Sequence, residues 1–508
     1  MYKLNVVTGK MKSISEESPG AQTECLPDRQ GKARLIMEYV PAAERSKSRE
    51  PYRYDTVKKM PRWRDLDTLA AANSGISGFA LRTIKDRQNS IPIGFDTNPD
   101  ILYYASNVGR ETYGIYGFNI KTGERIDLVL ESEEIDLIKP LPFGKNFPDE
   151  DILIFDRHTQ KLAGFRVEGR DRVITRWLSP EWQAVQKTLE LSLPGCSVTI
   201  MEWSADGTRV LLHSSGPEDT GTYHVYHRND KKIVSFAEKM PWLSKDVLYE
   251  RKKLNFGGRG GIINEAIITV PRESFGSSKS FPVIVVFPKG AQDAPRYEFC
   301  AEPHVFASMG YVVLEMQYRR PPEKALITSD VIPALNELAK HMPVNLKRVI
   351  LFGEDTGAAN ALTLLRMQPE RFCGAVGINA RVPGVSYFPK SRKMDGTAIR
   401  KRPGDERSIT KPVYILNNRP RGGRVTDLQR AVYEKTKEYV GTLKKSGVDA
   451  AFDDLPDEYF ENHSQAKAAV FANIENFINA ASVNAKVELG PIKVVKTMSA
   501  ESKSKRKQ

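Results

Sequence analysis

A short run in the second half of the chain places a carboxylate where a nucleophile would stand. The apolar stretch 349–352 has the pattern of a buried strand, and Gly353-Glu354-Asp355-Thr356-Gly357 follows as a sharp turn that opens a helix. In the G-x-S-x-G pattern, such a turn lifts a serine hydroxyl to the top of a sheet, where it attacks acyl carbons. Asp355 occupies the serine position here. The turn therefore indicates either a carboxylate nucleophile or a site that has lost its nucleophile.

The elements around this turn alternate between apolar strands and amphipathic helices. From about Leu243 onward we expect strands over 281–287, 311–316 and 412–416, and helices over 329–342, 427–446 and 465–481. Ser329 and Asp330 are candidates for capping the first of these helices. This alternation predicts a doubly wound, mostly parallel sheet.

The first half of the chain repeats itself. Segment 1–10 recurs as 115–124 and more loosely as 222–231, and segment 94–106 pairs with 202–214. A strand, a polar turn and a strand at intervals of tens of residues are typical of β-propeller blades. Roughly four blades fit before residue 242, and the chain opens in the middle of a blade motif. We expect an incomplete ring, a fragment or a misplaced start.

The expected organisation is therefore a partial propeller over 1–242, a sheet-and-helix domain over 243–482 and a charged tail over 483–508. The 508 residues are 40% hydrophobic and 27% charged, and the longest apolar runs fall well short of the roughly 20 residues that span a membrane. The net charge of +13 is scattered among 63 acidic residues, so we expect no nucleic-acid partner. Four separated cysteines and the absence of a signal-peptide pattern at the N-terminus predict a cytoplasmic protein; further sequence upstream would allow export.

Three stretches resemble the prolyl oligopeptidase family, which includes dipeptidyl-peptidases and acylaminoacyl-peptidases. They are 98–112, which resembles a blade segment before the catalytic domain, 310–319, and the end of the elbow helix at 368–372. The resemblance implies an α/β-hydrolase domain preceded by an all-β, partial β-propeller domain. It also implies serine-peptidase chemistry without cofactor or metal, and a short peptide or small molecule bound between the domains.

The resemblance also assigns the triad, and two of its three positions depart from the family pattern. Asp355 takes the place of the nucleophilic serine. The segment 417–421 takes the place of the H-G-x-x-D motif, which puts Arg421 at the position of the triad acid. The loop 455–463 is similar to the family's histidine loop and ends at His463. The position of the triad base is therefore still a histidine.

The oxyanion loop departs as well. Family members have H-G-G-P or Y-G-G after the corresponding strand, whereas this chain has Pro288-Lys289-Gly290-Ala291. Proline has no backbone N–H to donate. Gly290 and Thr356 remain as the candidate oxyanion-hole residues, and the Thr356 hydroxyl, one residue past the apex, is expected to point into the wall.

We interpret the chain as a pseudoenzyme of this family that binds peptides or acts as a scaffold, because a triad enzyme that loses its serine or histidine loses about a million-fold in rate. The alternative is an active hydrolase. It would use a recruited nucleophile, or use Asp355 with His463 as haloalkane dehalogenases and epoxide hydrolases use an aspartate. Asp449, Asp453 or Asp454 would then replace the missing acid. We further expect a buried Asp355 to pair with His463. The other histidines are assigned no role.

Overall fold

The structure is a computed structural model that describes most of the chain outside several loops and both ends. The described residues are 2–4, 10–13, 23–38, 52–55, 63–65, 90–107, 109–110, 112–133, 135–138, 152–169, 172–258, 263–272, 280–290, 295–317, 327–382, 409–420, 427–459 and 464–483. Contacts divide the chain into two compact units. The first comprises Met1–Ser215 and Gly221–Lys239, and the second comprises Gly216–Thr220 and Met240–Gln508.

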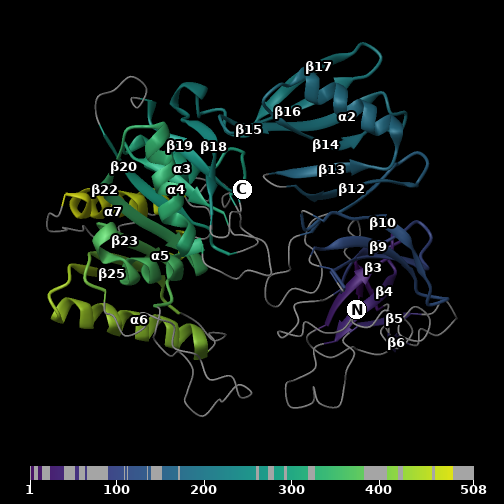
Figure 1. The fold of residues 1–508 in the computed structure, drawn as a ribbon. Coiled ribbons are helices and arrows are strands. Elements are labelled where there is room, and N and C mark those ends of the chain that lie inside the picture. The colour runs from purple at the N-terminus through teal and green to yellow at the C-terminus, as the bar shows by residue number, and fades with distance from the viewer. Residues whose placement is uncertain are drawn as a thin grey trace, which may run out of the picture. The chain divides into compact units, whose positions relative to one another are not determined.

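The first unit is built from small antiparallel sheets of consecutive strands (Figure 1). Three of them have four strands, in the orders β3-β4-β5-β6, β10-β9-β8-β7 and β14-β15-β16-β17, one has the three strands β11 to β13, and β1 pairs with β2. The bounds are β1 (Tyr2–Leu4), β2 (Met11–Ser13), β3 (Thr23–Pro27), β4 (Ala33–Glu38), β5 (Tyr52–Asp55), β6 (Trp63–Asp65), β7 (Ser90–Phe95), β8 (Ile101–Ser106), β9 (Gly114–Asn119), β10 (Arg125–Leu130), β11 (Leu153–Phe155), β12 (Leu162–Glu168), β13 (Val173–Trp177), β14 (Ser197–Trp203), β15 (Arg209–Gly216), β16 (Asp219–His227) and β17 (Lys232–Glu238).

One pair of sequence repeats falls at matching turns of two sheets, β7–β10 and β14–β17. Segments 94–106 and 202–214 both contain the turn from the first to the second strand of a four-stranded sheet. The N–H of Asp96 donates to the carbonyl of Ile101 at 3.0 Å, and the N–H of Ser204 donates to the carbonyl of Arg209 at 2.9 Å. These two sheets thus repeat one unit, and the sheet β7–β10 shares a core with β11–β13, as neighbouring propeller blades do.

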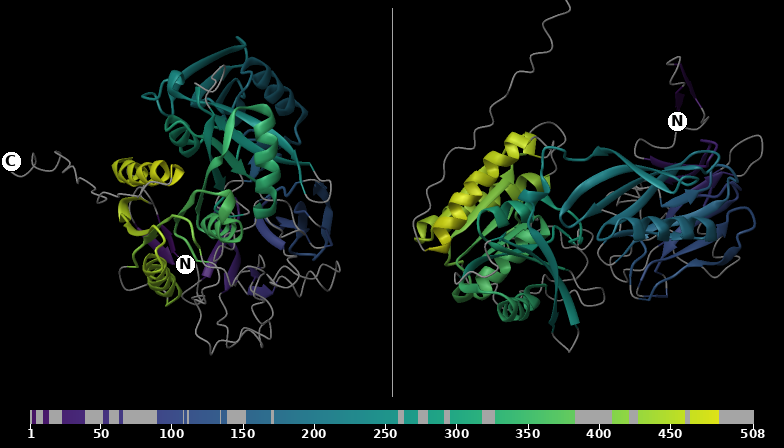
Figure 2. Two further views of the ribbon diagram at one scale, coloured as in Figure 1. Left: turned by 60° about the vertical axis from the view of Figure 1, so that its left-hand side comes forward. Right: turned by 90° about the horizontal axis from the view of Figure 1, so that it is seen from above.

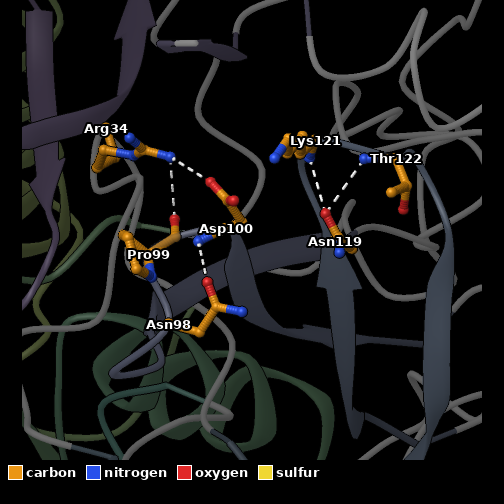
Figure 3. A network of polar contacts seen from close by, with 7 residues as sticks. All are labelled: Arg34, Asn98, Pro99, Asp100, Asn119, Lys121 and Thr122. Carbon is orange, nitrogen blue, oxygen red and sulfur yellow. Dashed lines mark hydrogen bonds and ion pairs between the residues drawn. The ribbon is translucent and has the colours of Figure 1, made fainter. Parts of the chain in front are cut away.

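A buried arginine joins two of these sheets (Figure 3). Arg34, on β4, is 1% exposed, and its guanidinium donates to the Pro99 carbonyl at 3.1 Å and to the Asp100 carboxylate at 3.0 Å. Pro99 and Asp100 lie in the turn between β7 and β8. In a neighbouring turn the Asn119 side chain accepts from two backbone N–H groups and closes an Asx turn.

The second unit is one eight-stranded sheet in the order β18-β19-β21-β20-β22-β23-β24-β25. The pairs β18–β19 and β19–β21 are antiparallel, and the other neighbouring pairs are parallel. The bounds are β18 (Glu250–Gly257), β19 (Ile263–Val270), β20 (Phe281–Phe287), β21 (Val312–Met316), β22 (Val344–Glu354), β23 (Gly374–Ile378), β24 (Val413–Asn418) and β25 (Ala450–Leu455). The predicted mostly parallel sheet is confirmed.

Helices cover both faces of this sheet. The bounds are α2 (Pro180–Ser192) in the first unit and α3 (Ala301–Ser308), α4 (Ile327–His341), α5 (Thr356–Met367), α6 (Asp427–Lys445) and α7 (Ser464–Ser482) in the second, with short 3-10 turns η1 (Lys245–Val247), η5 (Pro369–Arg371) and η6 (Asp457–Tyr459). Side chains of α4, α5 and α6 share one core with Val283 and Val285, whereas α3 and α7 share the other with Ile284 and Val286. Figure 2 shows α7 in yellow along the sheet. Successive side chains of β20 thus pack into the cores on opposite faces of the sheet, which explains why its sequence is apolar throughout.

Two details differ from the sequence-based expectation. The helix α4 includes Ile327, so Ser329 and Asp330 lie inside the helix and do not cap it; Asp330 is 2% exposed. The first unit also contains a helix, α2, which was not expected. Its N-cap is Ser179, whose hydroxyl accepts from the Trp182 N–H at 3.4 Å.

The segment Gly216–Thr220, the tip of the β15–β16 hairpin, belongs to the second unit. His304, on α3, makes a hydrogen bond to it. Its Nδ1 accepts from the Tyr249 N–H at 2.9 Å, so Nε2 carries the proton and donates to the Pro217 carbonyl at 3.3 Å. No helix in the described ranges is long and apolar enough to cross a membrane.

Candidate functional site

The turn after β22 has the geometry of a nucleophile elbow. Asp355 separates β22 from α5 and has φ 51° and ψ −113°, a conformation that residues other than glycine rarely adopt. Its N–H donates to the Ile378 carbonyl at 2.9 Å, which ties the apex to β23. The flanking glycines are required by space, because a Cβ on Gly353 would lie 2.2 Å from the carbonyl carbon of Gly357. The G-x-D-x-G pattern is therefore the sequence of a tightly folded turn with Asp355 at its apex.

Both residues at the apex are exposed. The expectation of a buried Asp355 carboxylate is wrong, since Asp355 is exposed and its side chain reaches solvent. Thr356 is also exposed and does not point into a wall. The roles assigned to Arg421 and His463 stay predictions, because both residues lie outside the described ranges.

The segment after β20, Pro288-Lys289-Gly290, closes over the elbow, and we call it the β20 strap. The backbone N–H of Thr356 donates to the Lys289 carbonyl at 3.1 Å. The strap is close enough that a Cβ on Gly357 would lie 2.5 Å from the Phe287 carbonyl oxygen and 2.7 Å from that of Pro288. In a working nucleophile elbow, the N–H after the nucleophile points at the developing oxyanion. Here that N–H is already hydrogen-bonded to the protein.

The side chain of Lys289 adds a second link between the strap and the elbow. Its ammonium lies 2.7 Å from the carboxylate of Glu354, which is 8% exposed and directly precedes the apex. Burial lowers the pKa of Lys289, but its hydrogen bond to the Glu354 carboxylate and the negative charges of Glu354, Glu302 and Asp355 give a net upward shift. Lys289 therefore stays charged and holds the strap from both its backbone and its side chain.

Further carboxylates lie near this ion pair. Burial, reinforced by the charge of Glu354, raises the pKa of Glu302 to about 8, so this side chain is largely protonated at neutral pH. Burial also raises the pKa of Tyr459, with smaller contributions from Glu354 and Glu302. The elbow is thus bordered by the ion pair of Glu354 with Lys289 and by the largely protonated carboxyl group of Glu302.

The strand β25 carries two of the proposed substitutes for the triad acid. Asp453 and Asp454 pair with Leu416 and Asn417 near the carboxyl end of β24, the strand that precedes the acid position. The Asp453 carboxylate accepts from the Tyr414 hydroxyl at 2.7 Å, and the Asp454 carboxylate accepts from the Tyr433 hydroxyl at 2.5 Å. Each of these carboxylates is engaged by a tyrosine of its own. Sequence reasoning named them but missed these partners.

No protein-family model matches the sequence, and no curated protein matches it. Solved structures do match the fold. A puromycin-hydrolysing peptidase from Mycobacterium tuberculosis has a TM-score of 0.62 and 14% identity, over 92% of this chain and 70% of that one. An acylaminoacyl peptidase in complex with Z-Gly-Gly-Phe-chloromethyl ketone has a TM-score of 0.58 and 10% identity, over 90% and 70%. Prolyl oligopeptidase B from Galerina marginata, bound to a 25mer macrocyclization substrate, has a TM-score of 0.58 and 13% identity, over 92% and 65%.

Proposed function

Since this chain has the fold of the prolyl oligopeptidase-type peptidases, a β-propeller domain followed by an α/β-hydrolase domain, we propose that it is a pseudoenzyme of that type that binds short peptides or acts as a scaffold. Its elbow carries Asp355 in place of the serine. The proposal follows from this substitution together with the occupied N–H of Thr356.

The observation that carries the proposal is the hydrogen bond from Thr356 to Lys289. Acyl transfer needs an activated nucleophile and donors aimed at the oxyanion. Asp355 has no hydroxyl, and the Thr356 N–H already donates to the Lys289 carbonyl at 3.1 Å. Loss of one oxyanion donor alone costs about 100- to 1,000-fold in rate, and loss of the nucleophile costs about a million-fold. The two losses support binding without turnover.

A short peptide is the ligand class that we propose. The matched acylaminoacyl peptidase is in complex with a peptide chloromethyl ketone, and the matched prolyl oligopeptidase B is bound to a 25mer substrate. Protein folds of this kind present the loops at the carboxyl ends of the parallel strands to their ligands. Asp355 and the β20 strap lie at such strand ends.

The runner-up is a working hydrolase in which Asp355 is the nucleophile and His463 activates water. The exposure of Asp355 favours it, because a carboxylate that reaches solvent can also reach a substrate. Such an enzyme attacks an sp3 carbon and forms an alkyl ester, so its substrates would be alkyl halides or epoxides rather than peptides.

Probes of the two chemistries separate these candidates. We expect no labelling of the full chain by a fluorophosphonate and no hydrolysis of aminoacyl or prolyl anilides, while isothermal titration with a Z-Gly-Gly-Phe-type peptide shows binding and mass spectrometry shows the peptide intact. Asp355→Ser alone is expected to stay inactive, since the Thr356 N–H is still held by the strap. Turnover by this variant would overturn the proposal.

The runner-up is tested by trapping. Incubation with an alkyl halide or epoxide, followed by peptide mapping, is expected to leave Asp355 unmodified. An ester on Asp355 that disappears in Asp355→Asn, but survives in the exposed control Asp457→Asn, would establish the hydrolase and reject the pseudoenzyme. Fluorophosphonate labelling that survives Thr356→Ala and is blocked by short peptides would instead reveal a recruited serine.

A further inference from the structure

The last strand of the β14–β17 sheet has an open outer edge. The strand β17 (Lys232–Glu238) pairs with β16 on one side, and no other described strand pairs with it (Figure 1). All of its residues except Ile233 are exposed. Val234 is 38% exposed and Phe236 59%, so two large apolar side chains lie in solvent on a strand whose outer N–H and C=O groups have no strand partner in the sheet order. An edge of this kind is a template for pairing with another strand.

The register of the sheet contributes to the exposure of Phe236. Tyr223 pairs with Ala237 and His224 pairs with Ser235, so the ladder skips Phe236. The ring of Phe236 lies 6.4 Å from that of Tyr223, measured between centroids. An unpaired residue of this kind forms a β-bulge, which changes the direction of its side chain. In β17 the bulge leaves the ring of Phe236 exposed.

Three other sheets of the first unit end differently. Their last strands each carry a charge at an interior position, namely Arg64 on β6, Asp127 on β10 and Arg176 on β13. Interior charges block pairing because a second strand would have to bury them. In β17 the charges stand only at the two ends, and the five residues between them are uncharged. This edge therefore lacks the charge that the other three carry.

The sequence of β17 is complementary to itself. An antiparallel pairing of two copies about a two-fold axis through Ser235 sets Lys232 opposite Glu238 and Val234 opposite Phe236 of the second copy, and each pair occurs twice. Opposite charges and apolar pairs across strands each stabilise a sheet by roughly 0.2–1 kcal/mol. We infer that two copies of this chain pair through β17 and form a continuous eight-stranded sheet. This dimer is independent of the chemistry at Asp355.

Cysteine cross-linking tests both the pairing and its register. Directly opposite residues of antiparallel strands have Cα atoms about 4.5 or 5.5 Å apart, which suits a disulfide. Ser235→Cys in the full chain is therefore expected to give a covalent dimer under mild oxidation. In Lys232→Cys the two new thiols lie six residues apart along the strands, about 20 Å, and no cross-link is expected. The parent chain, with its natural cysteines, supplies the background.

Charge exchange tests the partner. Lys232→Glu sets two carboxylates opposite each other at both ends of the interface, and Glu238→Lys sets two ammonium groups there. Each single change is expected to raise the dimer dissociation constant about tenfold in sedimentation experiments, and the double exchange is expected to restore it. Lys187→Glu, which makes the same charge change at an exposed position on α2, is the control and should leave the constant unchanged.

Three results would overturn the inference. One is a mass of 57.1 kDa at all protein concentrations, which would show that the end charges and the skipped residue protect the edge instead. Another is equal cross-linking through positions 232 and 235. The third is a double exchange that stays as weak as the singles, which would assign any association to another surface or another partner strand.

Discussion

Replacing Asp355 by glycine is expected to stabilise the second unit, because the elbow holds this residue in a strained conformation. At φ 51° and ψ −113° the Cβ of any L-residue meets its own backbone, and such conformations cost about 1–3 kcal/mol. Glycine adopts them without that cost. The side chain of Asp355 is exposed, so its removal forfeits little burial, and the backbone bond to Ile378 is retained.

The gain is reduced by the flexibility that glycine adds to the unfolded chain. This term is about 0.5–1 kcal/mol, so the middle values of the two ranges leave a net stabilisation of about 1 kcal/mol. For a unit of this size the expected rise in melting temperature is then about 2–4 °C. Asp355→Ala removes the same carboxylate but keeps the Cβ, and it should leave stability nearly unchanged. The difference between the two variants therefore measures the backbone strain.

Scanning calorimetry and urea unfolding of the full chain are the assays, with the transition of the second unit followed separately. Lys231→Gly is the matched control, because Lys231 also has a positive φ of 49° but lies in a turn of the first unit. Its effect should appear in the transition of the first unit. A second-unit transition that is unchanged or lowered in Asp355→Gly, with the alanine variant equal to it, would refute the strain argument.

Three further changes test the interior of the second unit. The buried guanidinium of Arg251 lies 2.9 Å from the Glu315 carboxylate, and Glu315→Gln removes its counter-charge. Urea unfolding should show that the free energy of unfolding falls by about 3–5 kcal/mol. A fall below about 1 kcal/mol would contradict the pairing. The folded pKa of Glu302, about 8, lies above its unfolded value, so the parent loses stability as pH rises from about 4.5 to 8. Glu302→Gln should remove that loss, whereas the control Glu337→Gln, at a partly exposed position on α4, should not. Burial lowers the pKa of His304 to about 4, so stability should fall as pH drops from about 6.5 to 4; titration of its imidazole by NMR near 6.5 would contradict this.

The sequence predicted those parts of the fold that leave a local pattern. The strand 281–287 was expected with the bounds that β20 has, since an apolar run between a serine and a proline-lysine-glycine turn can be read directly. The internal repeats identified the turns of the first unit for the same reason. The helix α2 was missed although its start is recognisable, because Ser179-Pro180-Glu181 supplies an N-cap, a proline at N1 and an acidic first turn.

The candidate site was predictable only as a list of positions. The exposure of Asp355 depends on how far the turn projects, and this is set by packing between segments distant in sequence. The bond from Thr356 to Lys289 is formed by two backbones 67 residues apart and involves no side chain, so no residue type signals it. Sequence reasoning identified both segments as an oxyanion site, whereas their mutual contact is a property of the folded chain alone.

The placement of the β15–β16 hairpin tip bears on how the chain can be divided. Because Gly216–Thr220 belongs to the second unit, the backbone passes from one unit to the other three times, after Ser215, after Thr220 and after Lys239. A single cut at Met240 would separate His304 from Pro217, whose carbonyl accepts the hydrogen bond from its Nε2–H. During synthesis, Gly216–Thr220 is made before the rest of the second unit. The second unit can therefore be completed only after the residues from Met240 onward have been made. The two units are interleaved in the gene, and neither is a contiguous module that recombination could exchange whole.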